Sequence, residues 1–599
     1  MNPSKVEDSN RLLAAAFTEG FRTLAQISND LVQDKIRSFE FANLTTATVP
    51  KKKKGAKAPA LSNVYGHSKP GEMLAVLGPS TEVQTLLLHL LAGKRHAVRK
   101  LSSGTFTTDE GQDLFDVVRP GYVQPSPVHL KTSTVREEFE FASALRTPRN
   151  VSAKLRQDLI RDLITSLDLE SQANAQVKSL SEAEMKRLAI GVELLSLPNL
   201  MLVDQPLVGD RRKDWETMEI LQTLAKLGVC QIVVAIASPL PEIFKLVSEH
   251  FLLVSEVGTT MSVGNAKDAV QYVASTGRVN HERFGDGDFL LLCSEFAKET
   301  WPSAHGDVEA KPGKLKHARI PQPLASSGTQ FAWLLRRELR YVQREYRWLL
   351  FRFCVVVALV GIICIMFADG ARQVGLRPYN IGSDLGSFIF PILIACFSTA
   401  MPLAIILFGF KQVVLREQSG ATYWLGWAFA SKMVTELVIN FTLLAMLVGM
   451  CHQVIGWSAG YVPLLIGFFV VAESCCSYAY FFALSLNNLG GALGLLMFAL
   501  GPQLLFLGAM ARFSLMPPWL AWINYVCNIT WGFKILISTE MDPALCTSPL
   551  ICYMWKVFKE SDWMDTDHIW QYYLILAAFF VFYRMLGLVN FYRAVERSC

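Results

Sequence analysis

The pattern of apolar and polar residues divides the chain into two parts of different character. Up to about Thr329, short apolar runs alternate with amphipathic stretches, as in a water-soluble α/β protein. After about Leu349, long apolar runs dominate the sequence. The first part predicts strands alternating with helices around a largely parallel sheet, and the second predicts membrane-spanning helices.

In the first part, three apolar runs have the length and composition of buried strands. They are Met73–Leu77, Leu200–Val203 and Cys230–Ile236. Helices are predicted to begin at Thr134 and to cover the amphipathic stretch Leu155–Leu169. Each of the three strands ends in polar or small residues, and ligands of parallel sheets bind beyond the carboxyl ends of strands. A functional site is therefore expected there.

In the second part, six apolar stretches each hold roughly the 20 residues that a bilayer requires. They cover approximately residues 349–368, 385–408, 434–454, 461–484, 492–511 and 569–588. With a cytosolic N-terminus, six spans put the C-terminus in the cytosol too. The basic residues Lys411, Arg416, Arg593 and Arg597 fall on that side, as expected for inner loops.

Composition agrees with an integral membrane protein and narrows the classes of partner. The chain is 51% hydrophobic and 18% charged, with a mean hydropathy of +0.29. A formal net charge of +5 over 599 residues gives no case for nucleic acid binding. The 12 cysteines form no C-x-x-C pair, and no histidine cluster has the spacing of a metal site.

The strand–turn–helix stretch Gly71–Gly93 has the layout of a phosphate-binding P-loop, which reads G-x-x-x-x-G-K-[ST]. Its first glycine, Gly78, and its final hydroxyl, Thr85, are present. Val83 replaces the second glycine, and Gln84 replaces the lysine. A β-branched residue resists the positive φ that glycine allows, and glutamine carries no charge to pair with phosphate. The frame of a nucleotide site is thus predicted without its charge.

A second motif, Val177–Leu195, identifies the family that this layout resembles. It is similar to the signature helix of ABC transporters of the G subfamily, the White and pleiotropic-drug-resistance type, V-x-x-[IVL]-S-G-G-E-x-K-R-x-x-I-G-x-E-L. Glu182 and Ala183 stand where that motif has two glycines. The resemblance extends from about Ser62 to the end. It implies an α/β P-loop nucleotide-binding domain followed by an all-α six-span domain, the reversed order typical of this subfamily.

The resemblance also assigns roles in a weak or vestigial nucleotide site. The positions that would contact nucleotide are Gly78, Ser80, Gln84, Thr85, Gln124, Ser181 and Asp204. Thr85 and Asp204 correspond to the Mg²⁺ ligands. Gln205 replaces the glutamate that polarises the attacking water, and Ala237 replaces the switch histidine, so no catalytic residue is intact. Binding of ATP and Mg²⁺ is predicted to be weak or absent, although the helix N-terminus still offers backbone N–H groups.

Four regions follow from the pattern and the resemblance. We predict an N-terminal helical extension over residues 1–50, favouring a helix packed on the next domain over one on the membrane surface. A degenerate nucleotide-binding domain is expected over 51–310. A linker and a basic amphipathic connecting helix occupy 311–346. The six-helix membrane domain covers 347–599, with a large outer loop at 514–568.

Three further groups of residues are assigned by the resemblance alone. Arg416, Glu417 and Tyr423 match the R-E-x-x-x-G-x-Y segment, which forms a short coupling helix touching the nucleotide-binding domain. Phe408 and Met510 fall near the substrate cavity between spans two and five. In the outer loop, where oxidation is allowed, Cys546 and Cys552 are predicted to form a disulfide.

Three ionisable residues lie inside predicted spans, where charges often mark a substrate or ion path. For Glu436 and Arg584 we favour a pair within the helix bundle, or a misplaced span boundary, over a functional role. For Glu473, in the middle of the fourth span, pairing and a functional role are equally weighted.

Two functions compete. The first is a half-transporter for lipids, sterols or amphipathic small molecules that does not hydrolyse ATP itself. The second is an ATPase-dead pseudo-transporter that binds lipid, moves it passively, or acts as a scaffold or regulator. Because six spans are too few for a complete pathway in this family, either function requires a homodimer or a heterodimer with another G-subfamily half-transporter. The plasma membrane and endomembranes both fit.

Overall fold

In the computed structural model the chain forms two compact units. The first consists of Met1–Trp333, Arg416–Trp424 and Glu596–Cys599, and the second of Leu334–Leu415 and Leu425–Val595. The structure describes residues 21, 24, 38–46, 61–108, 111–117, 119–149, 151–275, 286–296, 323–372, 381–457, 459–506, 517, 519, 522–540 and 568–598.

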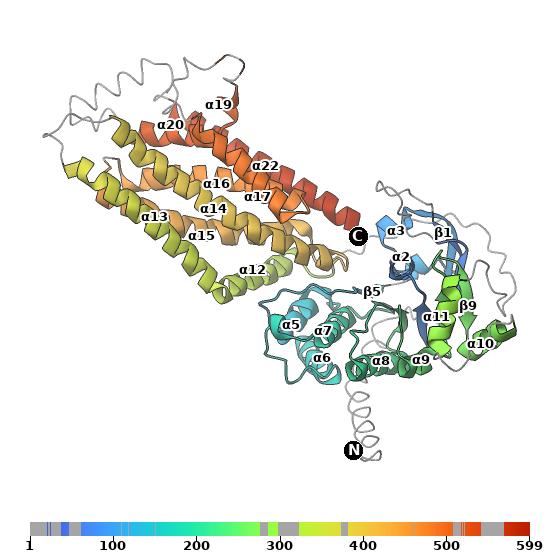
Figure 1. Ribbon diagram of the computed structural model, residues 1–599. Helices are drawn as coiled ribbons and strands as arrows, with labels where there is room; N and C mark the ends of the chain where they lie inside the picture. The colour runs from blue at the N-terminus through green and yellow to red at the C-terminus, as the bar shows by residue number, and fades with distance from the viewer. Residues whose placement is uncertain are drawn as a thin grey trace. The chain divides into compact units, whose positions relative to one another are not determined.

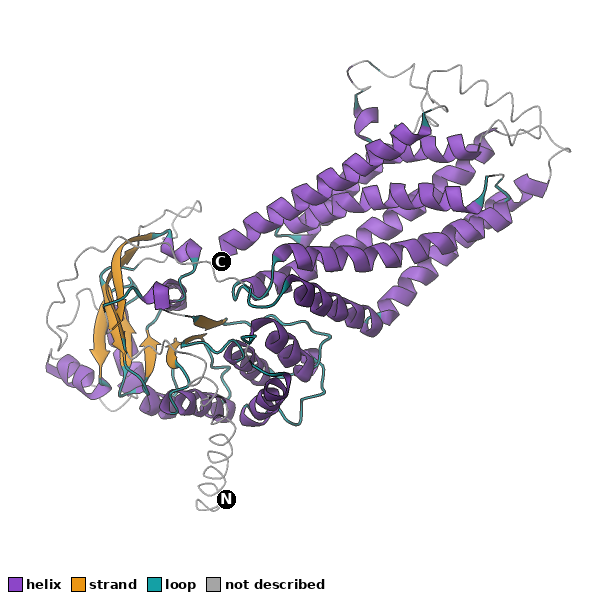
Figure 2. Cartoon of the chain, turned by 180° about the vertical axis from the view of Figure 1, so that it is seen from behind, coloured by secondary structure: helices purple, strands orange, loops and turns teal. Residues whose placement is uncertain are grey.

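Two sheets form the centre of the first unit (Figure 2). The larger sheet has six strands in the order β5-β6-β7-β3-β8-β9; its neighbours pair in parallel except β8 and β9. The smaller sheet is antiparallel, in the order β2-β1-β4. The strands are β1 (Phe39–Thr46), β2 (Val64–Ser68), β3 (Met73–Leu77), β4 (Leu101–Thr108), β5 (Pro120–Val123), β6 (Leu200–Asp204), β7 (Gln231–Ile236), β8 (Phe251–Val254) and β9 (Thr260–Gly264).

The three predicted strands are confirmed as β3, β6 and β7, and every residue in them is buried. Successive side chains point to opposite faces of the sheet, so each strand contributes to two cores. In β3, Met73, Ala75 and Leu77 join one core, and Leu74 and Val76 join the other. Burial on both faces explains why these strands are continuous apolar runs without alternation.

Helices cover both faces of the larger sheet (Figure 1). They are α2 (Thr81–Leu91), α3 (Arg95–Val98), α4 (Leu114–Val117), α5 (Val135–Arg146), α6 (Ala153–Ser166), α7 (Glu182–Leu194), α8 (Arg211–Lys226), α9 (Pro241–Val247), α10 (Ala266–Ser275) and α11 (Asp286–Phe296), with a 3₁₀ turn at Val177–Ser179. The helix start predicted at Thr134 is confirmed. Thr134 caps α5, and its hydroxyl and the Glu137 carboxylate satisfy each other's backbone N–H groups.

The prediction of a helical extension up to residue 50 is wrong for residues 39–46, which form β1. Aromatic residues at alternate positions, Phe39 and Phe41, are both buried there, and this period of two is that of a strand. Phe21 and Leu24 are also buried and belong to the main core of the first unit. Their burial supports a segment packed on the domain rather than on a membrane.

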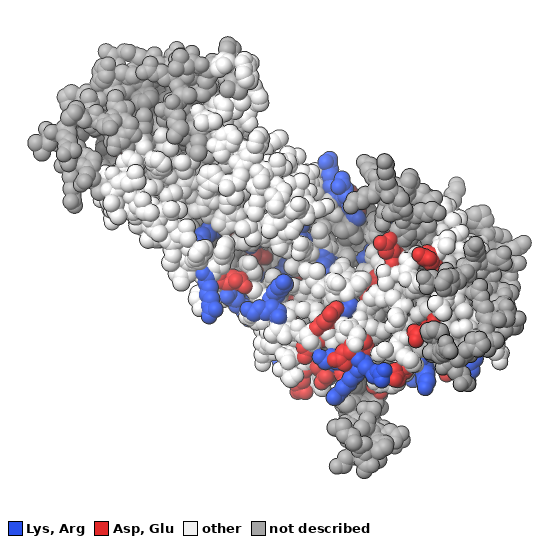
Figure 3. Space-filling view, in the orientation of Figure 1, with Lys and Arg blue, Asp and Glu red and all other residues white. Residues whose placement is uncertain are grey.

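The second unit is helical. Its elements, together with the connecting helix α12 that begins in the first unit, are α12 (Ser327–Arg344), α13 (Tyr346–Arg372), α14 (Ile381–Gln418), α15 (Leu425–Ile455), α16 (Tyr461–Ser485), α17 (Leu489–Leu500), a 3₁₀ turn at Gly501–Leu504, α19 (Ile523–Val526), α20 (Asn528–Glu540) and α22 (Ile569–Ser598). In the face seen in Figure 3, most of this unit's surface is uncharged, and basic residues gather where α12 meets α13.

Five of these helices are long and apolar enough to cross a bilayer: α13, α14, α15, α16 and α22. A shorter apolar stretch, Leu489–Gln503, lies where the fifth of six spans is predicted, and the remainder of that span falls mostly outside the described residues. The count of six spans therefore stays a prediction.

The charged residues predicted inside the spans are paired within the bundle. Glu473 binds Arg584 and also accepts a 2.8 Å hydrogen bond from the Asn440 amide. Glu436 lies 3.2 Å from Lys432, which is itself 3.1 Å from Glu338. The pairing expected for Glu436 and Arg584 is confirmed, and Glu473 is paired as well.

Candidate functional site

The P-loop backbone is held by contacts that need no phosphate. A Cβ added at Gly78 would lie 2.5 Å from the Val254 carbonyl oxygen of β8, so this glycine is required for packing. Ser80 caps α2, and its hydroxyl accepts a hydrogen bond from the Val83 N–H at 3.4 Å. One of the helix N-terminal donors that would face phosphate is thus already engaged.

The Gln84 side chain points back into the sheet and is fully buried. Its Nε2 donates to the carbonyl oxygens of Ile236 at 2.9 Å and Gly78 at 3.1 Å, with a weaker contact to Val76 at 3.4 Å. These acceptors lie at the carboxyl ends of β3 and β7. Gln84 therefore ties two strand ends together and is not directed toward a ligand.

Gln205 and Ala237 extend this arrangement. The Gln205 Nε2 donates to the Gln84 Oε1 at 2.7 Å, and the Gln205 Oε1 accepts from the backbone N–H of Ala237 at 3.1 Å. We call Gln84, Gln205 and Ala237 the amide ladder. Hydrogen bonds between neutral groups thus link three positions where the family places charged or titratable groups. Each of these groups is engaged by its neighbour in the ladder.

Lys186, on the signature helix α7, also contacts this region. Its ammonium donates to the Gln205 carbonyl at 2.6 Å and to the Pro125 carbonyl. Gln205 has a φ of +48°, an uncommon conformation for a residue with a side chain. Contacts from both its backbone carbonyl and its side chain hold it in that conformation.

The two predicted Mg²⁺ ligands are adjacent. The Thr85 hydroxyl donates to Asp204 Oδ2 at 2.7 Å, and the Tyr122 hydroxyl donates to the same oxygen at 2.9 Å. Asp204 is fully buried, and its Oδ1 has no hydrogen-bond partner among the described residues. Burial raises the pKa of Asp204, and the hydrogen bonds from Thr85 and Tyr122 offset only part of this effect.

A chain of hydrogen bonds runs outward from Asp204. Because Tyr122 donates to the carboxylate, its oxygen can accept from His89 Nε2, 3.0 Å away. His89 Nδ1 can then accept from His96 Nε2 at 3.1 Å. Burial, followed by the nearby Lys94 ammonium and His96, lowers the pKa of His89 to about 2, so this imidazole is neutral. This assignment gives every hydrogen in the chain one acceptor.

Sequence reasoning did not include Tyr122, His89, His96 or Lys186 in the site. Tyr122 could have been found, because it precedes the end of β5, and the parallel neighbour β6 ends at Asp204. His89 lies in the last turn of α2 and His96 in α3, and no motif marks them.

Replacing Tyr122 with phenylalanine tests this chain of hydrogen bonds. We expect Tyr122→Phe to destabilise the first unit by about 1–3 kcal/mol, because a buried carboxylate loses a donor and His89 loses its acceptor. Thermal unfolding of the purified full-length protein would measure the effect. A melting temperature within 1 °C of that of the unaltered protein would show that the chain contributes nothing measurable to stability.

The residues of this site fit Mg²⁺ better than they fit the triphosphate of ATP. A hydroxyl beside a carboxylate with one unpartnered oxygen is a donor set that Mg²⁺ accepts, so Thr85 and Asp204 would hold the ion and balance part of the phosphate charge. The triphosphate does not fit the rest of the site. Gln84 carries no charge where the P-loop has its lysine, and the Lys186 ammonium is directed at backbone carbonyls.

The signature motif forms a self-contained helix cap. The Ser181 hydroxyl and backbone N–H donate to the Glu184 carboxylate at 2.8 and 2.7 Å, and the Ser181 oxygen accepts from the Glu184 N–H at 3.4 Å. Glu182 is exposed in the first turn of α7, and Ala183 is buried. Two carboxylates thus already occupy the helix N-terminus, where an anion would otherwise bind. Gln124 is half-buried immediately after β5.

The segment Arg416–Trp424, between α14 and α15, belongs to the first unit. Arg416 Nη1 is 3.0 Å from His129 Nδ1, and the Tyr423 hydroxyl donates to the Glu417 carboxylate. The Tyr423 ring meets Phe141 of α5 edge-on, with centroids 6.4 Å apart. The three predicted coupling residues are therefore together. The separate coupling helix is not found, because α14 ends at Gln418 and the rest of the segment is a turn.

A buried ion pair lies against this segment. Arg146 of α5 donates two hydrogen bonds, of 2.9 and 2.6 Å, to the Glu193 carboxylate of α7. Both side chains are 9% exposed. A Cβ added at Gly420 would lie 2.6 Å from Arg146 Nη2, so the turn approaches the guanidinium as closely as its backbone permits. The pair joins α5 and α7 directly beneath the turn.

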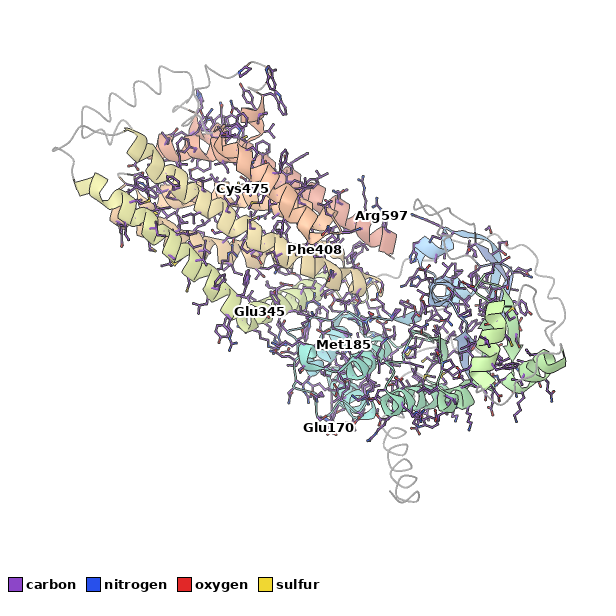
Figure 4. The ribbon with its side chains drawn as sticks, in the orientation of Figure 1. Glu170, Met185, Glu345, Phe408, Cys475 and Arg597 are labelled. Carbon is purple, nitrogen blue, oxygen red and sulfur yellow. The ribbon has the colours of Figure 1, made fainter. Side chains whose placement is uncertain are left out.

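The remaining predicted residues lie elsewhere or outside the described part. Phe408 is half-buried on α14, as labelled in Figure 4. Met510, Cys546 and Cys552 fall outside the described residues, so the cavity assignment and the disulfide stay predictions.

Comparison with known proteins agrees with this architecture. Residues 61–208 match the family model described as ABC transporter, and residues 329–541 match that described as ABC-2 type transporter. The rat broad substrate specificity ATP-binding cassette transporter ABCG2 is 25% identical over 547 residues, covering 82% of this chain and 81% of that protein. ABC transporter G family member 7 of Arabidopsis thaliana is 26% identical over 445 residues, covering 68% of this chain and 60% of that protein.

A third relative matches a smaller part. ABC transporter G family member 1 of Dictyostelium discoideum is 30% identical over 250 residues, which is 40% of this chain and 31% of that protein. The two family models follow each other in the order nucleotide-binding domain, then membrane domain. The chain belongs to the ABC transporters, as a member of the G subfamily.

Proposed function

We propose that this chain is a subunit of a dimeric G-subfamily membrane transporter for lipids, sterols or amphipathic small molecules, and that it does not itself hydrolyse ATP. The observation that supports the lack of ATP hydrolysis is the amide ladder. Gln84 and Gln205 stand where the family has a phosphate-binding lysine and a catalytic glutamate, and each is engaged by the other at 2.7 Å.

Hydrolysis needs a group that accepts a proton from, or polarises, the attacking water, and positive charge on the transferred phosphate. An amide at Gln205 accepts no proton, and its oxygen is already bonded to the Ala237 N–H. Ala237 has no side chain that reaches a phosphate. The loss of lysine, glutamate and histidine from one site supports a chain without turnover of its own.

The substrate class rests on the membrane unit and on the relatives. Long apolar helices, whose Lys432–Glu436 and Arg584–Glu473 charges are paired inside the bundle, suit an apolar ligand, for which large apolar cavities are typical sites. One relative carries the words broad substrate specificity in its name.

The signature favours a second candidate, a pseudo-transporter that binds or moves lipid passively or regulates a partner. In an ABC dimer each ATP lies between the P-loop of one chain and the signature of the other. Glu182 would bring a carboxylate to the phosphate in the site built on a partner's P-loop, and Ser181 is occupied by Glu184. Like charges at close range in a partly dry site cost energy.

ATP hydrolysis by the purified full-length protein in lipid nanodiscs tests the proposal. We expect no vanadate-sensitive activity from the chain alone and at most weak activity with a co-purifying half-transporter. Lipid or sterol flux in reconstituted vesicles then separates the candidates, because an ATP-dependent flux with a partner supports the transporter subunit and an ATP-independent flux supports the pseudo-transporter. Robust, vanadate-sensitive hydrolysis by the homodimer would overturn both.

A further inference from the structure

His129 occupies an unusual position next to the Arg416–Trp424 segment. It lies in the loop between β5 and α5, and its side chain is fully buried. Its Nδ1 is 3.0 Å from Arg416 Nη1 and 3.2 Å from the Glu138 Oε2 of α5. Its other ring nitrogen, Nε2, has no hydrogen-bond partner among the described residues.

These two contacts cannot be hydrogen bonds at the same time. A guanidinium only donates, so the contact with Arg416 requires a lone pair on Nδ1. An ionised carboxylate only accepts, so the contact with Glu138 requires a hydrogen on Nδ1. The nitrogen has one or the other. The same geometry therefore serves two arrangements of the ring. A neutral ring with its hydrogen on Nε2 accepts from Arg416, whereas a ring with a hydrogen on Nδ1, as in the imidazolium or the other neutral tautomer, donates to Glu138.

The surrounding charges make the protonated state responsive to Arg416. Besides Glu138 and Arg416, the charged groups that face His129 are Glu417 at the end of α14 and Glu193 of α7, with Arg146 pairing Glu193. With His129 neutral, this group has three carboxylates and two guanidinium groups. Protonation of His129 brings the net charge of this group to zero, but it places an imidazolium 3.0 Å from the Arg416 guanidinium.

Arg416 borders a small cavity of about 20 Å³. It is lined by both guanidinium groups, by Glu138, Glu193 and Glu417, and by Gly420 and Thr422 of the turn. Loss of the Arg416–His129 bond would remove a tie between this turn and the loop before α5. Other contacts keep the segment on the first unit, because the Tyr423 ring packs on Phe141 and the Trp424 N–H donates to the Gln330 Oε1 at 2.9 Å. Loss of the His129 bond would therefore loosen the segment without releasing it.

We propose that His129 is a proton-operated switch that holds the Arg416–Trp424 segment on the first unit when neutral and loosens it when protonated. This inference does not depend on whether the chain hydrolyses ATP. If the proposed transporter function is correct, the switch would make coupling between the two units sensitive to acidification.

The direction of the pH effect follows from where His129 titrates. Burial and then Arg416 lower its pKa, and Glu138 and Glu417 offset only part of this, so it lies below the ordinary value of 6.5. A histidine released to solvent titrates near 6.5. The attached state thus binds fewer protons than the loosened state, and its stability falls as the pH decreases below about 6.5, by up to about tenfold per pH unit.

Hydrogen–deuterium exchange of the full-length protein in nanodiscs between pH 7.5 and 5.5 tests the proposal. After correction for intrinsic exchange, we expect protection of residues 416–424 to fall by up to about tenfold between pH 6.5 and 5.5. Peptides from α8, far along the chain from this segment, should show no such change. Protection that is independent of pH over this range would overturn the switch.

Two variants separate His129 from the nearby carboxylates. In His129→Asn, an amide can accept from Arg416 and donate to Glu138 at once and does not titrate, so protection should become independent of pH while Glu138, Glu193 and Glu417 remain. In Glu138→Gln, loss of the carboxylate that favours the imidazolium lowers the attached-state pKa further. The fall in protection should still begin near pH 6.5, but its lower limit should shift to lower pH. If His129→Asn retained the full pH dependence, the carboxylates would be responsible. Should that variant fail to fold, the shift in Glu138→Gln decides the question.

Discussion

Restoring the catalytic glutamate alone, by Gln205→Glu, should leave ATPase activity undetectable and should also destabilise the first unit. In the amide ladder Gln205 donates to the Gln84 Oε1 at 2.7 Å. A carboxylate there has no hydrogen to donate, so two acceptor oxygens would face each other in a buried site. We expect a cost of about 1–3 kcal/mol, the range for a buried group that loses its partner.

A matched substitution separates this effect from the change of charge. Gln157 lies exposed on α6, and Gln157→Glu makes the same chemical change outside the site. We expect its melting temperature to stay close to that of the unaltered protein, since exposed substitutions are usually within about 0.5 kcal/mol. Vanadate-sensitive ATP hydrolysis by Gln205→Glu, or an unchanged melting temperature, would contradict our description of the ladder.

The double variant Gln84→Lys with Gln205→Glu tests whether a hydrogen-bond donor at position 84 compensates for the donor lost at position 205. A lysine can donate to the new carboxylate, so the pair should recover stability relative to Gln205→Glu alone. Activity should still be absent, because Val83 still replaces the second P-loop glycine and Ala237 still replaces the switch histidine. Glycine at Glu182 and Ala183 should raise hydrolysis only in a heterodimer, where the partner supplies an intact P-loop.

Much of the fold could be predicted from the sequence, because its signals are local. Strands β3, β6 and β7 are buried on both faces, so each appears as a continuous apolar run. The capping residue Thr134 marks the start of α5. The strand β1 was missed because the helical spacing of the preceding residues was extended through it, and its period of two is interrupted after Phe41.

The broken motifs could also be read from the sequence, but what replaces their chemistry could not. The sequence shows a glutamine at position 84 without showing that its amide turns back to the carbonyls of Ile236 and Gly78. That choice depends on groups brought together from β3, β6 and β7. For the same reason Tyr122 and His129 were missed, since each acts through a residue distant in sequence.

Gly78 illustrates how a motif residue can be retained for a different reason. In a working P-loop the first glycine begins the phosphate-binding turn. Here it also prevents a collision with the Val254 carbonyl of β8. Ser80 likewise caps α2 in the absence of any ligand. Gly78 and Ser80 thus have packing and capping roles that need no phosphate.

Breaking the Arg146–Glu193 pair from one side should cause the largest loss of stability among single substitutions in the first unit. Both side chains are nearly buried, and two hydrogen bonds join them. Arg146→Met would leave the Glu193 carboxylate buried without its partner, at a cost of about 3–5 kcal/mol. Burial raises the pKa of Glu193, but Arg146, together with Arg416 and His129, lowers it by more, so the pKa lies below its ordinary 4.5 and the pair contributes fully at pH 7.

The double variant Arg146→Met with Glu193→Leu should be far less destabilised than either single variant, because no charge is left buried alone. The exposed pair Arg161–Asp158 on α6 provides the control, since Arg161 is 73% exposed there and surface pairs contribute little. Thermal unfolding would rank the four variants, and a fall of the order of 10 °C is expected for Arg146→Met. Hydrogen exchange should then show the loss of protection in α5, α7 and residues 416–424, because Arg146 contacts Gly420 as well as Glu193. If Arg146→Met were as stable as Arg161→Met, or if the double variant were as unstable as the worse single one, the ion pair would not be what joins these helices beneath the turn.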